Sequence, residues 1–260
     1  MSACCQALLL ACGRFFFRVR NALFPTLLLV ILVATRPTQF FGSAALDAVA
    51  IAAGVVLLLG GEAFRMLVIG YAYIQRGGRN REVFANELVT RGFYAHTRNP
   101  MYVANFSVVV GFSFIYGSAW GYGLLVPLFA YIYLAITTVE ETYLREKFAA
   151  AYDDYARRVN RFFPDLRGLR KSLAEFSYDW RRALVKDYGT LCFTLVGLLG
   201  LVAWKIAWVY GYAAHKSALL LLCGGCVAVA IFYGIIRYLK ITKRLRAARR
   251  EETEQPIEAG

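Results

Sequence analysis

The sequence predicts an all-helical integral membrane protein that crosses the bilayer about six times. Of its 260 residues, 59% are hydrophobic and only 18% are charged. A soluble domain of this size needs more polar surface than that to face water. Apolar stretches long enough to cross a bilayer recur along the chain. The basic residues, moreover, are distributed as the positive-inside rule requires.

Six apolar segments have the length expected of membrane spans. They are residues 21–39, 44–69, 101–117, 119–139, 188–210 and 218–239. They divide the chain into three parts. Residues 1–75 form an N-terminal pair of spans, and residues 76–187 hold a basic loop, a two-span hairpin and polar helices. Residues 188–260 add a C-terminal hairpin and a charged tail.

The net charge of +13 is concentrated on one side of this arrangement, where 26 of the 30 lysines and arginines fall. The distribution predicts a multi-pass protein with both termini cytoplasmic, in a bacterial inner membrane or an endoplasmic reticulum. It also predicts attraction to anionic lipid headgroups. We expect no nucleic-acid partner, because no base-reading motif accompanies the charge.

Several kinds of chemistry are excluded by composition and motif. Two histidines, His96 and His215, are too few for the histidine clusters of membrane di-iron enzymes. The chain has no GxGxxG, GxSxG or Walker pattern. Cys223 and Cys226 have CxxC spacing but lie within an apolar span that lacks further ligands, so no metal site is predicted.

The stretch ELVTRGFYAHTRNPMY, residues 87–102, crowds polar and aromatic side chains just before a span. Pro100 fits the first turn of a helix, whose free amides can receive an anionic group. Tyr94 and Tyr102 offer aromatic faces that suit a purine or a sulfonium cation. The alternative is a span start with an aromatic belt and positive-inside arginines. The residues by themselves favour neither interpretation.

A second polar stretch begins with Glu140 and Glu141, where an apolar span ends. Glu140 is costly at the membrane boundary unless it has a partner, which favours a functional role. For Glu141 we expect a solvated helix position paired with Arg145 at i, i+4. The spacing of Leu144, Phe148, Tyr152, Tyr155 and Val159 predicts a helix that Pro164 ends.

Residues 171–186 predict a basic amphipathic helix that lies in the membrane interface. Its apolar side chains would be Leu173, Phe176, Trp180 and Leu184. We expect this helix to be structural.

Together the two stretches resemble a known family. GFYxxxRNPxY at residues 92–102 and EExxLxxxFxxxYxxYxxxVxRFxP at residues 140–164 are similar to the isoprenylcysteine carboxyl methyltransferases, relatives of the membrane phospholipid N-methyltransferases. The resemblance covers residues 76–165. It implies a methyltransferase that uses S-adenosylmethionine in a cytosol-facing pocket and methylates a lipophilic acceptor, an isoprenylcysteine-type carboxylate or a lipid headgroup. The cofactor-binding residues it implies are Glu87, Leu88, Val89, Tyr94, Arg98, Asn99, Pro100, Met101, Tyr102 and Glu140.

Two departures from the family pattern bear on the substrate. Asn99 stands where the family usually has histidine, and it can still donate and accept hydrogen bonds. Ile136 stands where the eukaryotic carboxyl methyltransferases have an arginine that contacts the substrate. The acceptor, which we expect to enter from the bilayer, therefore need not be an isoprenylcysteine. Glu62 and Arg65 in the second span are candidate substrate-binding residues, although a structural ion pair is the favoured alternative.

Two other classes of protein remain as alternatives. A membrane sterol-type reductase that uses NADPH carries a similar motif, but usually near its C-terminus. A membrane scaffold or transporter would use Glu62 and Arg65 as a transport pair. Binding of one cofactor or the other distinguishes these classes.

Overall fold

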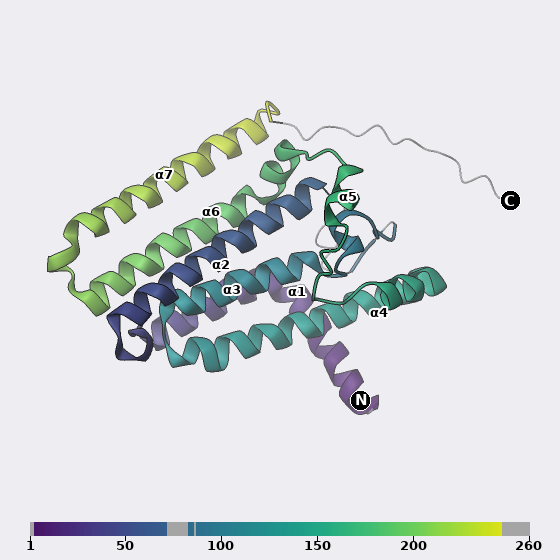
Figure 1. The fold of residues 1–260 in the computed structure, drawn as a ribbon, viewed down its shortest axis with the longest axis horizontal. Coiled ribbons are helices and arrows are strands. Elements are labelled where there is room, and N and C mark those ends of the chain that lie inside the picture. Colours follow the sequence, from purple (N-terminus) through teal and green to yellow (C-terminus); the bar gives the residue numbers. More distant parts are fainter. Residues whose placement is uncertain (1–2, 72–82, 86, 246–260) are drawn as a thin grey trace.

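The computed structural model describes residues 3–71, 83–85 and 87–245, and every regular element in them is helical, as predicted. The main helices are α1 (Ala3–Ala34), α2 (Ala44–Tyr71), α3 (Pro100–Tyr116), α4 (Val126–Arg158), α5 (Leu169–Ala174), α6 (Trp180–Lys205) and α7 (Lys216–Ile241). Figure 1 shows α2, α3, α4, α6 and α7 side by side, with α5 at one end. We call the end with α5 the loop end and the other the turn end.

Four helical segments are long and apolar enough to cross a membrane, judged by length and composition. They are Ala44–Tyr71, Gly121–Arg158, Trp180–Gly211 and Ala213–Ile241. The bent α1 makes a fifth if its two arms count as one span, and α3 is a shorter apolar helix. Each of the six predicted spans therefore falls on a helix, and four or five of them meet the length criterion.

Helix α1 bends by 85° between its two arms, residues 6–20 and 25–34. Pro25 begins the second arm. Proline has no N–H to donate, and its ring clashes with the preceding turn, so a proline within a helix is a usual cause of such a bend. The bend brings the end of the first arm, with Arg20, to the loop-end parts of α3 and α4.

Glycines allow α2 and α3 to approach closely. A Cβ on Gly54 would lie 2.7 Å from the carbonyl oxygen of Gly111, and one on Gly111 would lie 2.6 Å from that of Gly54. Further along the same contact, a Cβ on Gly61 would lie 2.8 Å from the carbonyl oxygen of Ala104. Small residues at helix contacts are typical of membrane bundles, because packing rather than the hydrophobic effect holds the helices together there.

We predict that Gly54→Ala destabilises the protein whereas Gly60→Ala does not. The first methyl meets the α3 backbone, and such overpacking costs about 1–3 kcal/mol. Gly60 lies on the same helix with open space around it, so alanine there adds only helix propensity, up to about 1 kcal/mol. Thermal unfolding of the two purified variants in detergent measures the difference. Equal stability would show that α2 and α3 do not pack through Gly54.

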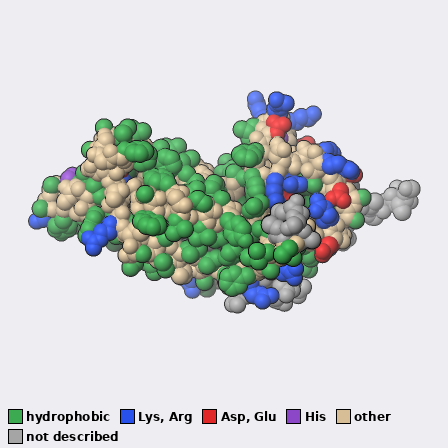
Figure 2. Space-filling model, turned by 90° about the horizontal axis from the view of Figure 1, so that it is seen from below, with side chains coloured by type: hydrophobic (Ala, Val, Ile, Leu, Met, Phe, Trp, Pro, Cys, Tyr) green, Lys and Arg blue, Asp and Glu red, His purple; other side chains and the backbone are tan. Residues whose placement is uncertain are grey.

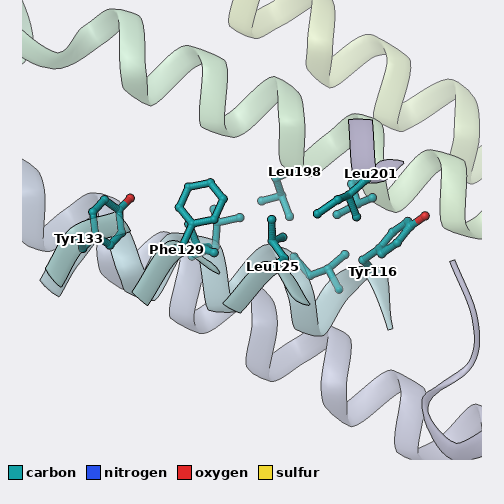
Figure 3. Close-up of a cluster of buried hydrophobic side chains, with 10 residues drawn as sticks. Tyr116, Leu125, Phe129, Tyr133, Leu198 and Leu201 are labelled. Carbon is teal, nitrogen blue, oxygen red and sulfur yellow. The ribbon is translucent and has the colours of Figure 1, made fainter. Parts of the chain in front are cut away.

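The apolar core is formed by buried side chains from α1, α2, α3, α4 and α6. Figure 3 shows Phe129 and Tyr133 of α4 in a row that leads to Leu198 and Leu201 of α6. These side chains are buried. The C-terminal hairpin is thus continuous with the rest of the core, through α6. In α7, by contrast, few residues are buried.

Two predictions about the polar helices need correction. The helix predicted after Glu140 is present as the second half of α4, but it ends at Arg158, before Val159 and Pro164, and it is interrupted at Ala149, where φ is 43°. The interfacial helix predicted over residues 171–186 is wrong, because α5 ends at Ala174 and α6 begins at Trp180. Asp179 stops any continuous helix there: its carboxylate caps α6 by accepting from the Arg182 N–H at 2.9 Å, and its own N–H donates to the Gly70 carbonyl.

Charged side chains gather at the loop end, and apolar side chains cover much of the length between the two ends in the view of Figure 2. This distribution is the one expected of a protein whose middle lies in hydrocarbon. Arg76, Arg79 and Arg81 of the predicted basic loop, and the charged tail after residue 245, lie outside the described residues.

Candidate functional site

Tyr102 and Glu140 meet at the loop end, as the resemblance implies for a shared site. The Tyr102 hydroxyl donates to Oε1 of Glu140 at 2.7 Å. Tyr102 stands in the first turn of α3, and Glu140 stands where the apolar part of α4 ends. The Glu140 side chain keeps 24% of its surface exposed. A carboxylate at the membrane boundary thus has a partner and remains reachable from the loop end.

Arg20 of α1 completes this group, and the sequence interpretation assigned it only to topology. Its Nη1 donates to the Tyr102 hydroxyl at 3.1 Å and lies 3.7 Å from Oε1 of Glu140. Its guanidinium also lies over the Phe17 ring, 4.2 Å from the centroid. A lone arginine at the end of a span satisfies the positive-inside rule, so no local signal marks it as part of a site.

Glu141 is not the solvated residue that the sequence suggested. It is buried, its Oε1 accepts from Asn99 Nδ2 at 3.0 Å and from Arg161 Nε at 3.1 Å, and its Oε2 lies 3.4 Å from Arg98 Nη2. The expected partner Arg145 pairs with Asp153 instead. Glu141 therefore ties the start of α3 to the segment after α4, and that expectation was wrong.

Asn99 and Pro100 form the predicted helix start. Pro100 lies in the first turn of α3. Asn99 is buried, and both hydrogens of its amide are used, one by Glu141 and the other by the Arg161 carbonyl at 3.1 Å. The backbone N–H groups of Tyr102 and Val103 both donate to the Asn99 carbonyl. The Val103 bond is the first regular bond of the helix, but the Tyr102 amide, which the sequence left open for an anionic ligand, is thus engaged within the chain.

The remaining candidate cofactor residues surround this helix start. Val83 packs against the same buried cluster as Tyr102, the one formed by Phe17, Ile132 and Ile136. Glu87 is exposed, whereas Leu88, Val89, Tyr94 and Met101 are partly buried. The carbonyl of Tyr94 accepts a hydrogen bond from the Tyr155 hydroxyl at 2.7 Å, which anchors this region on the end of α4.

The region that contains these residues is similar to a known protein family. Residues 48–151 match the model of the phospholipid methyltransferase family. The matched segment begins in α2 and ends in α4, so it includes Tyr102, Glu140 and Glu141. The resemblance noted from the sequence extended over residues 76–165, so the match begins earlier and ends before Arg161.

Two curated proteins are also similar to this chain. One is the nickel-cobalt-cadmium resistance protein NccN of Alcaligenes xylosoxydans xylosoxydans, 40% identical over 82 residues, which are 32% of this chain and 38% of NccN. The other is the cobalt-zinc-cadmium resistance protein CzcN of Cupriavidus metallidurans, 36% identical over 81 residues, 31% of this chain and 37% of CzcN. The chain thus spans less than two fifths of these relatives. No solved structure matches it significantly.

Glu62 and Arg65, the candidate substrate residues, form a buried polar network inside the bundle. Arg65 Nη2 lies 2.7 Å from Asp187 Oδ1, and its Nε donates to Asp187 Oδ2 at 3.2 Å and lies 3.6 Å from Glu62 Oε2. Arg65 also donates to Asn105 of α3. The Thr194 hydroxyl donates to Glu62 Oε1 at 2.8 Å. The expected pair of Glu62 and Arg65 therefore exists within α2. The nearest anionic partner of Arg65, however, is Asp187 of α6, which lies outside the matched segment.

Two cavities lie apart from these residues. An apolar cavity of about 160 Å³ lies between the second arm of α1, α3 and α6. Pro25, Phe112, Tyr116 and Leu201 are among the residues that line it. A polar cavity of about 200 Å³ lies at the loop end, where His96 Nε2 lies 3.0 Å from Ser172 Oγ. Within the described part of the chain, no cluster of histidine, cysteine and carboxylate side chains could hold a metal ion.

Proposed function

We propose that this protein transfers a methyl group from S-adenosylmethionine to a lipophilic acceptor at the loop end of the bundle. The observation that carries the proposal is the coincidence of two findings. Residues 48–151 match a methyltransferase family, and the residues that the methyltransferase motifs single out, Tyr102 and Glu140, are hydrogen-bonded to each other across α3 and α4.

The residues of the loop end fit this cofactor. Bound S-adenosylmethionine supplies a methyl group on a sulfonium cation. The partly exposed carboxylate of Glu140 offers a negative charge or an acceptor for ribose hydroxyls. The ring of Tyr102 adds an aromatic face that attracts a cation. Leu88, Val89 and Met101 supply partly buried apolar surface for a purine.

The protein's own residues act in this reaction by placement. Arg20 and Tyr102 hold the Glu140 carboxylate in one orientation, and Glu141 with Arg98 and Arg161 fixes the start of α3 beside it. Correct placement of two reactants supplies a large part of the acceleration in such transfers. An ionised carboxylate acceptor needs no base, and an amine needs only to be unprotonated. The proposal therefore requires no dedicated acid–base pair.

The acceptor is lipophilic in this proposal and enters from the bilayer. The site stands where the apolar part of α4 ends and α3 begins, so an acceptor held in the bilayer could present its reactive group there. Ile136, which replaces the arginine of the carboxyl methyltransferases, is completely buried beside Phe17 and Ile132. That position contributes to packing between α1 and α4. A carboxylate acceptor would therefore need another cationic partner, and a lipid headgroup is the favoured acceptor.

The names of NccN and CzcN refer to resistance to nickel, cobalt, zinc and cadmium. We propose that any role of this chain in metal tolerance follows from methylation of membrane components. A host that expresses the Glu140→Gln variant should then lose both lipid methylation and metal tolerance, relative to a host that expresses the wild-type chain. Metal tolerance that persists without methyl transfer would separate the two.

Methyl transfer into membranes tests the proposed function. Purified protein in detergent would be mixed with total membrane lipid and methyl-labelled S-adenosylmethionine, and lipid and protein products would then be separated. We expect label in the lipid fraction, a minimal amount of label with Glu140→Gln, and no competition by NADPH. Label in neither fraction, or tight binding of NADPH instead, would contradict the proposal.

A further inference from the structure

Helix α6 lies outside the segment that matches the methyltransferase family, yet it supplies a buried carboxylate to a residue inside that segment. Asp187 and Arg65 are 1% and 6% exposed. Their two contacts, Nη2 to Oδ1 at 2.7 Å and Nε to Oδ2 at 3.2 Å, make a bidentate pair. Such a pair fixes the plane of the guanidinium as well as its position.

The fixed guanidinium then reaches the helix that carries the candidate site. Arg65 donates to the side-chain oxygen of Asn105 on α3. Asn105 follows Tyr102 by three residues, which is about 4.5 Å along a helix axis. Because α3 starts at the loop end, Asn105 lies deeper in the bundle than Tyr102. The network thus adjoins the side of the site that faces the membrane interior.

A second path joins the network to Tyr102 through α4. The rings of Tyr102 and Tyr133 lie 5.4 Å apart between centroids, and Tyr133 is close enough to Arg65 for their side chains to interact electrostatically. On the other side of Arg65, Glu62 is held by Thr194 of α6. Two residues of α6 therefore orient both charged side chains of α2 that lie beside the site.

Loss of the Asp187 carboxylate would be energetically costly, because Arg65 would remain buried without its closest anionic partner. A guanidinium buried at membrane depth needs a charged partner, and loss of that partner lets it turn toward other acceptors. Any reorientation would move Asn105 and the aromatic wall formed by Tyr102 and Tyr133. Asn105 and Tyr133 lie farther from the loop end than Tyr102 and Glu140 do, on the side of the site toward the middle of the bundle.

We propose that α6 is part of the catalytic unit, with Asp187 as a positioning residue that sets the acceptor side of the site through Arg65 and Asn105. This inference rests on the proposed function. It assigns to the C-terminal hairpin a role that the matched segment 48–151 does not contain. It also separates two sides of the site: Glu140 serves the cofactor, and the network around Arg65 serves the acceptor.

The Asp187→Asn variant tests the inference, with vesicles of total membrane lipid as acceptor and labelled S-adenosylmethionine as donor. Asparagine keeps the shape of the side chain and removes its charge. We expect the apparent KM for vesicle lipid to rise about tenfold, which corresponds to roughly 1.4 kcal/mol. The Kd for S-adenosylmethionine, measured by calorimetry, should stay within about twofold of the wild-type value.

The structure contains a matched control for loss of stability. Asp47 and Lys205 form another buried ion pair between α2 and α6, but at the turn end. Asp47→Asn removes a charge from the same two helices without touching the site, so its KM should equal that of the wild type. Thr194→Val, which removes one hydrogen bond to Glu62 but no charge, is a milder second variant for the case in which Asp187→Asn does not fold. We expect it to raise KM about threefold.

The outcomes distinguish this inference from the proposed function. Wild-type protein that methylates no lipid would overturn the proposed function itself. An active wild type with an unchanged KM in both Asp187→Asn and Thr194→Val would overturn the positioning role. An equal rise of KM in Asp47→Asn would reduce the role of α6 to general stability, and that result would also contradict the inference.

Discussion

Glu140→Gln should weaken S-adenosylmethionine binding tenfold or more. Glutamine has nearly the same shape but no charge, so it cannot attract the sulfonium cation. A tenfold loss corresponds to about 1.4 kcal/mol, within the range that a charge-assisted hydrogen bond contributes. The change also removes the ionic partner of Arg20, and it leaves the Tyr102 hydroxyl a neutral amide oxygen as acceptor in place of a carboxylate. Isothermal titration calorimetry on the detergent-solubilised protein measures the affinity.

Variants of Tyr102 and Arg145 show whether a loss of S-adenosylmethionine binding is specific to the proposed site. Tyr102→Phe keeps the aromatic face and removes only the hydroxyl, so we expect a smaller loss than with Tyr102→Ala, which should reach tenfold. Arg145→Gln removes a charge from the same helix, but its pair with Asp153 is largely exposed, and binding should not change. Unchanged affinity in folded Glu140→Gln and Tyr102→Ala would remove both residues from the cofactor site.

Lys205→Met should destabilise the protein more than Gly54→Ala does. Lys205 Nζ donates to Asp47 Oδ1 at 2.6 Å and to the Ile115 carbonyl at 2.8 Å, and Tyr210 donates to the other Asp47 oxygen at 2.7 Å. Asp47 is fully buried. Removal of the ammonium leaves an uncompensated carboxylate, and such a break costs about 3–5 kcal/mol.

The control for this prediction is the double variant Asp47→Asn with Lys205→Met. It leaves no buried charge at this position, so it should recover a large part of the stability lost by Lys205→Met alone. Lys216→Met, an exposed lysine near the same end, should leave stability unchanged. Thermal unfolding in detergent provides the comparison. A double variant no more stable than Lys205→Met would show that the charge balance at Asp47 does not govern stability there.

The sequence by itself determined the class of the protein, the position of its helices and the two stretches around Tyr102 and Glu140. Hydropathy over some twenty residues and the position of a proline are local properties, so they can be read without knowledge of the packing. Pro100 begins α3 as expected, and each predicted span lies on a helix. Where local signals compete, as around Asp179, a single capping residue divided a helix that periodicity had predicted as continuous.

Only the tertiary structure decided which charges meet. Arg20 and Tyr102 are separated by 82 residues, Arg65 and Asp187 by 122, and Asp47 and Lys205 by 158. Each pair depends on which helices are neighbours and on their relative rotation, and no local pattern encodes either. The same reason explains Glu141, whose i, i+4 neighbour Arg145 was the natural choice from sequence alone. Buried partners from other segments displaced that local choice, because a carboxylate shielded from water must be satisfied by the groups that lie beside it.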